Sequence, residues 1–199
     1  MKLFTPFCLL PIILLSAFAP GVNNPTVKDY FEVPGPLTFN KTAYKLSWSA
    51  HPNATYYKQE YLPAVENAEH FTKMIMLEVV TGNYSLEELV KTKTAELDQR
   101  KKTDAVANYS VIRNPTTGEY LIDFVISQGT GANAIVEWNV YRYVKLKEKT
   151  GKKGVQLFAL SKRAYGTATT AFLKQLTTDR SADINAMVAY KVPELKLAN

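Results

Sequence analysis

The sequence predicts an α+β protein with an antiparallel β-sheet of about six or seven strands that is covered by helices on its faces. Seven segments alternate between apolar and polar residues or are continuously apolar, as strands are, and two others have the spacing of helices. The last two strand segments are apolar on both sides, and such a sheet needs cover on both faces. The expected order of elements is β-β-β-α-β-β-β-β-α.

The first three strands are expected at residues 43–49, 55–62 and 73–80. The first alternates, with Tyr44, Leu46 and Trp48 on one face, and the second is rich in aromatic residues. The third, KMIMLEVV, is nearly continuously apolar, which is typical of a strand buried on both faces.

A helix follows the third strand. Ser85 and Glu88 have the spacing of a capping box, in which each side chain bonds the other residue's backbone N–H. Apolar side chains then recur on one side of the helix, at Leu86, Leu89, Val90 and Leu97. Lys101 and Lys102 close it with charges that suit a helix C-terminus.

Four more strands are expected at 105–113, 119–127, 134–147 and 155–165, separated by turn residues at 114–118, 129–131 and 150–151. A C-terminal helix is expected over 168–176 and 181–190, with a break near Asp179.

The hairpin of the last two strands predicts a register. If its turn is centred on Thr150 and Gly151, Val144 lies opposite Leu157 and Trp138 lies opposite Arg163. Both faces of this hairpin are then apolar, and Trp48 and Trp138 both fall on stripes that are expected in the core.

The N-terminus has the three parts of a secretory signal: Lys2, an apolar run over residues 3–18, and small residues before residue 20 or 22. We therefore expect a signal peptide at 1–21, cleaved after Ala19 or after Gly21. An irregular lead-in at 22–39, one domain at 40–192 and a tail at 193–199 follow. The protein is expected to be exported to the periplasm or the medium, with no transmembrane segment after cleavage.

Composition excludes several kinds of site. The only cysteine, Cys8, lies within the signal, so the remaining chain has no disulfide or thiol chemistry. His51 and His70 are the only histidines, too few for a multi-histidine metal site, and we expect no cofactor and no metal. The formal charge of +6 allows an anionic partner, but because the protein is expected to be exported we expect no nucleic-acid partner. The pattern fixes no oligomeric state.

Two segments resemble secreted bacterial proteins that share the fold of the photosystem II PsbP subunit and the yeast-type Ran-binding proteins. They are QEYLP at 59–63 followed by EHFTKMI at 69–75, and the strand from Gly154 to SKRAY at 161–165. The resemblance implies a PsbP-like α/β/α sandwich and a binding or assembly role without catalysis. It carries no binding-site residue over to this sequence.

Four charged residues interrupt apolar strand faces, namely Arg142, Arg163, Asp123 and Glu78. Buried charges must be paired, so two arginines near two carboxylates would form a polar cluster. Such a cluster could bind a carboxylate or phosphate. Internal ion pairs or exposed strand ends explain the same pattern, and Arg163 opposite Trp138 could be a cation–π pair.

Lysines crowd the tip of the last hairpin, at Lys145, Lys147, Lys149, Lys152 and Lys153. They could bind an anionic surface, or they could keep the hairpin soluble and protect its edge.

Three functions remain open. The leading hypothesis is an exported, non-catalytic binding or accessory protein that contacts an envelope protein or an anionic surface. A hydrolase or lyase would need His70, Glu78, Asp123 and Arg142 to converge in one cleft. A ligand-binding protein would need a cavity framed by Tyr141, Tyr143 and a helix.

Overall fold

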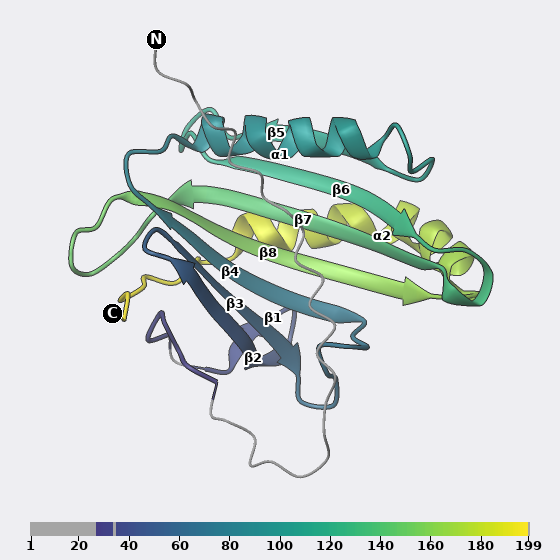
Figure 1. Ribbon diagram of the computed structural model, residues 1–199, viewed down its shortest axis with the longest axis horizontal. Coiled ribbons are helices and arrows are strands. Elements are labelled where there is room, and N and C mark those ends of the chain that lie inside the picture. The colour runs from purple at the N-terminus through teal and green to yellow at the C-terminus, as the bar shows by residue number, and fades with distance from the viewer. Residues whose placement is uncertain (1–26, 34, 199) are drawn as a thin grey trace.

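A computed structural model describes residues 27–33 and 35–198, which form one eight-stranded antiparallel sheet and two α-helices (Figure 1). The strand order across the sheet is β1-β2-β3-β4-β8-β7-β6-β5. The strands are β1 (Leu37–Phe39), β2 (Thr42–Asn53), β3 (Tyr56–Pro63), β4 (Lys73–Thr81), β5 (Asn108–Arg113), β6 (Tyr120–Gln128), β7 (Ile135–Lys145) and β8 (Gly154–Tyr165). The helices are α1 (Leu86–Arg100) and α2 (Ala168–Ala189), with a short 3₁₀ turn at Gly131–Asn133.

The α+β class is confirmed, but the expected sandwich of six or seven strands with helix-covered faces, PsbP-like or otherwise, is wrong. The sheet has eight strands and curls into a half-barrel. Helix α1 packs on β5–β7, and α2 packs on β7 and β8, so the helices cover only part of each face. The additional strand, β1, lies in the segment 22–39 that was expected to be irregular.

Helix α1 begins as the sequence predicts. The Ser85 side chain accepts a hydrogen bond from the Glu88 N–H, and the Glu88 carboxylate accepts one from the Ser85 N–H. The predicted break in the C-terminal helix is wrong, because α2 runs unbroken through Asp179. Figure 1 shows α2 passing behind β7 and β8.

The predicted register of the last hairpin is wrong by one residue. Tyr143, not Val144, lies opposite Leu157, and Trp138 lies opposite Lys162 rather than Arg163. Because side chains alternate between faces, this shift changes which residues of β8 share a face with Trp138. The loop at 146–153 is longer and less regular than the tight turn on which the prediction was centred.

The prediction that Trp48 lies in the core is also wrong. It is 39% exposed, whereas Trp138 is 1% exposed. The pairing of β2 with β3 shifts between Leu46 and Trp48, so Leu46 opposes Tyr61 but Trp48 opposes Glu60. Such a bulge moves the residues that follow it to the opposite face, here from Trp48 to Ala50, where the pairing shifts again.

The sheet has a separate apolar core on each face. One core joins α1 to Met76, Ile122, Tyr143 and Leu157. The other joins α2 to a larger set that includes residues from both terminal segments, and its members include Phe31, Trp138, Val140, Phe158, Met187, Leu195 and Leu197.

The two terminal segments pair with each other and with the hairpin between β7 and β8. Lys196 N–H donates to the carbonyl of Phe31 at 2.9 Å, and Leu195 N–H donates to that of Lys147 at 2.8 Å. The tail therefore closes the α2 side of the sheet where the helix does not reach. The expected signal peptide lies outside the described residues. No helix within 27–33 and 35–198 is long and apolar enough to cross a membrane.

The base of the lysine-bearing hairpin requires a glycine. A Cβ added at Gly154 would lie 2.2 Å from the Val80 carbonyl oxygen, whereas one at Gly151 would meet no atom within 4 Å. We expect Gly154→Ala to lower the free energy of unfolding by about 3 kcal/mol. Gly151→Ala should cost about 1 kcal/mol, because only its positive φ is strained. Urea denaturation of both variants measures this, and equal losses would contradict the steric argument.

Candidate functional site

A cavity with a volume of about 610 Å³, lined by residues of the described ranges, lies between α1 and the sheet. This is within the size range of small-molecule sites. Its walls are mostly apolar and aromatic, with a few charged groups. The lining residues are Thr55, Tyr56, Glu78, Val80, Tyr84, Glu88, Leu89, Thr92, Lys93, Glu96, Tyr141, Tyr143, Val155 and Leu157.

Two neighbouring rows of side chains across the sheet form the cavity floor. In one row Tyr56 lies opposite Val80, which lies opposite Val155. In the other Glu78 lies opposite Leu157, which lies opposite Tyr143. The floor therefore spans β3, β4, β8 and β7, and Glu78 stands among apolar and aromatic neighbours.

The position of α1 explains why this floor is open. The helix packs on β5–β7, so only its flank faces β8 and β4. That flank carries Leu89, Lys93 and Glu96. The Lys93 ammonium pairs with Glu96 at 2.9 Å and lies 5.5 Å from the centre of the Tyr141 ring.

Glu78 is the central charged group of the floor. Its Oε2 accepts a hydrogen bond from the Tyr56 hydroxyl at 2.8 Å, and its Oε1 lies 3.8 Å from the Lys58 ammonium. Lys58 lies closer to Glu60, at 2.9 Å. Burial by itself would lower the pKa of Lys58, but Glu78 and Glu60 outweigh it and raise that pKa, so Lys58 stays charged.

Tyr56, Tyr141 and Tyr143 of the cavity stay neutral. Burial, and then the nearby Glu78 carboxylate, raise the pKa values of Tyr56, Tyr141 and Tyr143 above the ordinary value for a phenol. The hydroxyls of Tyr141 and Tyr143 have no hydrogen-bond partner among the described residues. The cavity thus offers two uncharged hydroxyls that can donate or accept.

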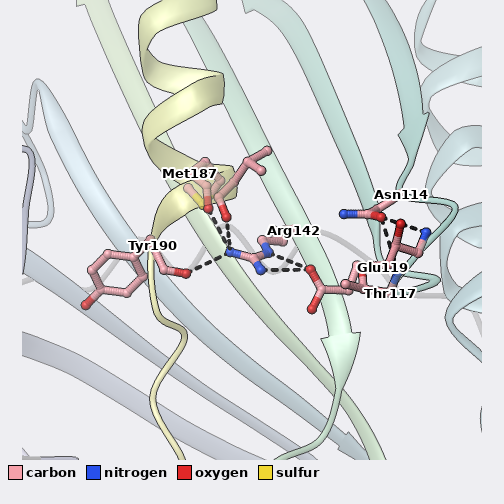
Figure 2. A network of polar contacts seen from close by, with 8 residues as sticks. Asn114, Thr117, Glu119, Arg142, Met187 and Tyr190 are labelled. Atoms are coloured by element: carbon pink, nitrogen blue, oxygen red, sulfur yellow. Dashed lines mark hydrogen bonds and ion pairs between the residues drawn. The ribbon is translucent and has the colours of Figure 1, made fainter.

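Arg142 does not lie in this cavity. It reaches across the other face of the sheet to the end of α2, where one nitrogen donates to the carbonyls of Met187, Val188 and Tyr190 at 2.8–3.0 Å (Figure 2). The other two nitrogens donate to Glu119, at 2.7 and 3.1 Å. Arg142 therefore caps the C-terminus of α2, where a cation also suits the helix dipole.

Asp123 holds the middle of α2. It is 3% exposed and accepts hydrogen bonds from Arg180 of α2, the Trp138 ring and Ser110. Burial alone would raise the pKa of Asp123, but Arg180 and these hydrogen bonds outweigh it and keep that pKa below the ordinary value. The same residues line a smaller cavity of about 320 Å³.

Arg163 lies on the α1 face, where it pairs with Glu137 and its guanidinium stacks 4.1 Å from the centre of the Phe71 ring. Lys162, rather than Arg163, lies over Trp138, at 5.9 Å. Asp123 and Arg142 lie on one face of the sheet, and Glu78 and Arg163 on the other. The predicted cluster of two arginines and two carboxylates is therefore wrong, since each arginine already binds another carboxylate.

The hairpin lysines are exposed: Lys145, Lys147, Lys149, Lys152 and Lys153. Within the part of the chain that the structure describes, none of their ammonium groups forms an ion pair. The backbone that carries them is well tied, because Glu148 accepts hydrogen bonds from the N–H groups of Thr150, Lys152 and Leu197.

His70 does not join Glu78, Asp123 and Arg142. It is exposed and stacks on Tyr165 at 4.0 Å, outside both cavities. Sequence reasoning missed Lys93, Glu96 and Arg180. A signal for Glu96 existed, because polar residues at 88, 92 and 96 recur every four positions beside the apolar side of α1.

The contacts of Arg142 predict a stability effect. We expect Arg142→Met to lower the free energy of unfolding by about 3 kcal/mol, because it leaves three carbonyls and Glu119 without their donor. Lys145→Met, on the same strand but exposed, should change it by less than about 0.5 kcal/mol. Urea denaturation measures both, and hydrogen exchange should quicken at residues 184–190 in the first variant alone. Similar effects of the two changes would refute the capping role.

Comparison with known proteins gives one match, to a protein-family model. No curated protein and no solved structure matches the chain. The resemblance of the two segments to secreted bacterial proteins therefore stays a prediction, although the sandwich that it implied is wrong. A protein-family model, whose description names no activity, ligand or partner, matches residues 31–192. That match spans the whole sheet and both helices, and the chain belongs to this family.

Proposed function

We propose that this protein is an exported, non-catalytic binding protein that holds a small amphipathic molecule in the cavity between α1 and the sheet. The observation that carries the proposal is the cavity of about 610 Å³, with an apolar floor and a few converging polar groups. The N-terminal signal pattern supports export.

The chemistry of the lining supports binding over catalysis. The lining residues in the described ranges include no serine, histidine or cysteine, so they offer no nucleophile paired with a histidine base. Their charged groups already have protein partners: Glu88 caps α1, Glu96 pairs with Lys93, and Glu78 accepts from Tyr56. Such groups are suited to orienting a ligand over an apolar surface.

A second candidate function is attachment to an anionic surface through the hairpin lysines. The observation in its favour is that the hairpin carries five exposed ammonium groups that form no ion pair with any described residue, on a backbone fixed by Glu148. Gly82, just before α1, donates to the Lys153 carbonyl at 2.9 Å, so the hairpin lies next to the N-terminal end of the cavity helix. The two functions are compatible in one molecule.

Filling the cavity tests the first proposal. N-phenyl-1-naphthylamine, a neutral apolar dye, should bind one molecule per chain with a rise in fluorescence. Leu89→Trp places a large ring at the cavity wall and should weaken binding by at least tenfold. Val188→Trp, an equally bulky change at an exposed site on α2, should leave it unchanged. Absence of dye binding, or equal binding by both variants, would refute the cavity as the site.

Charge reversal tests the second proposal. Vesicles of phosphatidylglycerol and phosphatidylcholine should sediment the wild-type protein at low salt. The change of Lys145, Lys147, Lys152 and Lys153 to glutamate should reduce binding more than tenfold. The matched control changes Lys91, Lys101, Lys102 and Lys174 to glutamate, so both quadruple variants have the same net charge. If both quadruple variants lose binding equally, the effect is one of net charge and the hairpin is not the contact.

A further inference from the structure

We propose that the ligand of the α1 cavity is an amphipathic cation, a single ammonium group on an apolar body, with Glu78 as its counter-ion. This inference rests on the proposed binding function and names the chemical class of the ligand.

The balance of charges in the cavity favours a cation. Three carboxylates line it, from Glu78, Glu88 and Glu96, against the single ammonium of Lys93. Lys58, 3.8 Å from Glu78, does not reverse this balance, because it lies closer to Glu60. An anionic ligand would have to enter against this excess of negative charge, whereas a cation would reduce it.

The aromatic walls favour the same charge. Tyr56, Tyr84, Tyr141 and Tyr143 all line the cavity, and the electron-rich face of a phenol ring attracts an ammonium group. The protein already makes this contact itself, since the Lys93 ammonium lies 4.9 Å from the centre of the Phe124 ring and 5.5 Å from that of Tyr141. The hydroxyls of Tyr141 and Tyr143, which have no partner within residues 27–33 and 35–198, can accept hydrogen bonds from a ligand N–H.

The floor separates a charged position from an apolar one. Glu78 has Leu157 directly opposite it on β8, and the adjacent row is formed by Val80 and Val155 beside Tyr56. Leu89 of α1 adds an apolar wall. A molecule that placed its ammonium at Glu78 would lay its apolar body over these valine and leucine side chains, so the arrangement fits an alkyl or aryl amine better than a small inorganic cation.

Displacement of N-phenyl-1-naphthylamine at pH 7 by three compounds of one chain length tests this inference. Octylammonium, octanol and octanoate each have eight carbons and carry a positive, a neutral and a negative head group. In the wild-type protein octylammonium should displace the dye at about a tenfold lower concentration than octanol, and octanoate should be the weakest. Octanoate equal to or better than octylammonium would overturn the ligand class while the dye still binds, so the proposed function would stand. A wild-type protein that does not bind the dye would overturn both.

Two charge-neutralising variants assign the effect to a residue. Glu78→Gln should reduce the tenfold preference for octylammonium over octanol to less than about threefold, with little change in dye binding. Glu87→Gln removes the same charge from the outward side of α1, where Glu87 pairs with Lys91, and should keep the preference. Loss of preference in both variants, or in neither, would refute Glu78 as the counter-ion. The ranking of the three compounds by the wild-type protein tests the ligand's charge independently of these variants.

Discussion

Charged contacts hold helix α2 to the sheet, and the arrangement of that whole face depends on them. The helix has few fully buried side chains, Asp183 and Met187 among its described residues. Arg180 pairs with buried Asp123, Lys162 of β8 pairs with Asp183, and Arg142 caps the last carbonyls. Buried charges are tolerated only when paired, so each strand charge on this face fixes one position along the helix. These ion pairs fix the position of α2 along the sheet. Packing of a narrow apolar stripe would fix that position less strongly.

The opposite face is organised by packing, and the consequence is a cavity. Helix α1 buries Leu86, Val90 and Leu97 against the sheet and begins at a complete capping box. Because it sits over β5–β7, the floor beside it on β8, β4 and β3 stays open. Polar residues therefore have different roles on the two faces. Asp123 and Arg142 bind the protein's own helix, whereas Glu78 and the cavity tyrosines face a space that a ligand can enter.

The two faces of the sheet explain why the charges singled out in the sequence divide as they do. Successive side chains of a strand point to opposite faces of the sheet. Two charged residues that each interrupt an apolar strand face therefore need not lie on the same side of the sheet. Arg142 and Arg163 lie on adjacent strands, yet they point to opposite faces and bind Glu119 and Glu137 respectively. An arginine that interrupts an apolar stripe indicates a buried ion pair, but the identity of its partner depends on register.

The sequence by itself determined the α+β class, seven of the eight strands to within a few residues, and the start of α1, because local periodicity and capping chemistry encode them. One open hypothesis required a cavity framed by Tyr141, Tyr143 and a helix, and the tertiary structure, not the sequence, shows that such a cavity exists. Only the tertiary structure decided the curl of the sheet, the register of β7 with β8, the exposure of Trp48 and the pairing of Asp123 with Arg180. These features depend on a bulge, on loop geometry and on contacts between residues far apart in the chain, and no local pattern records them.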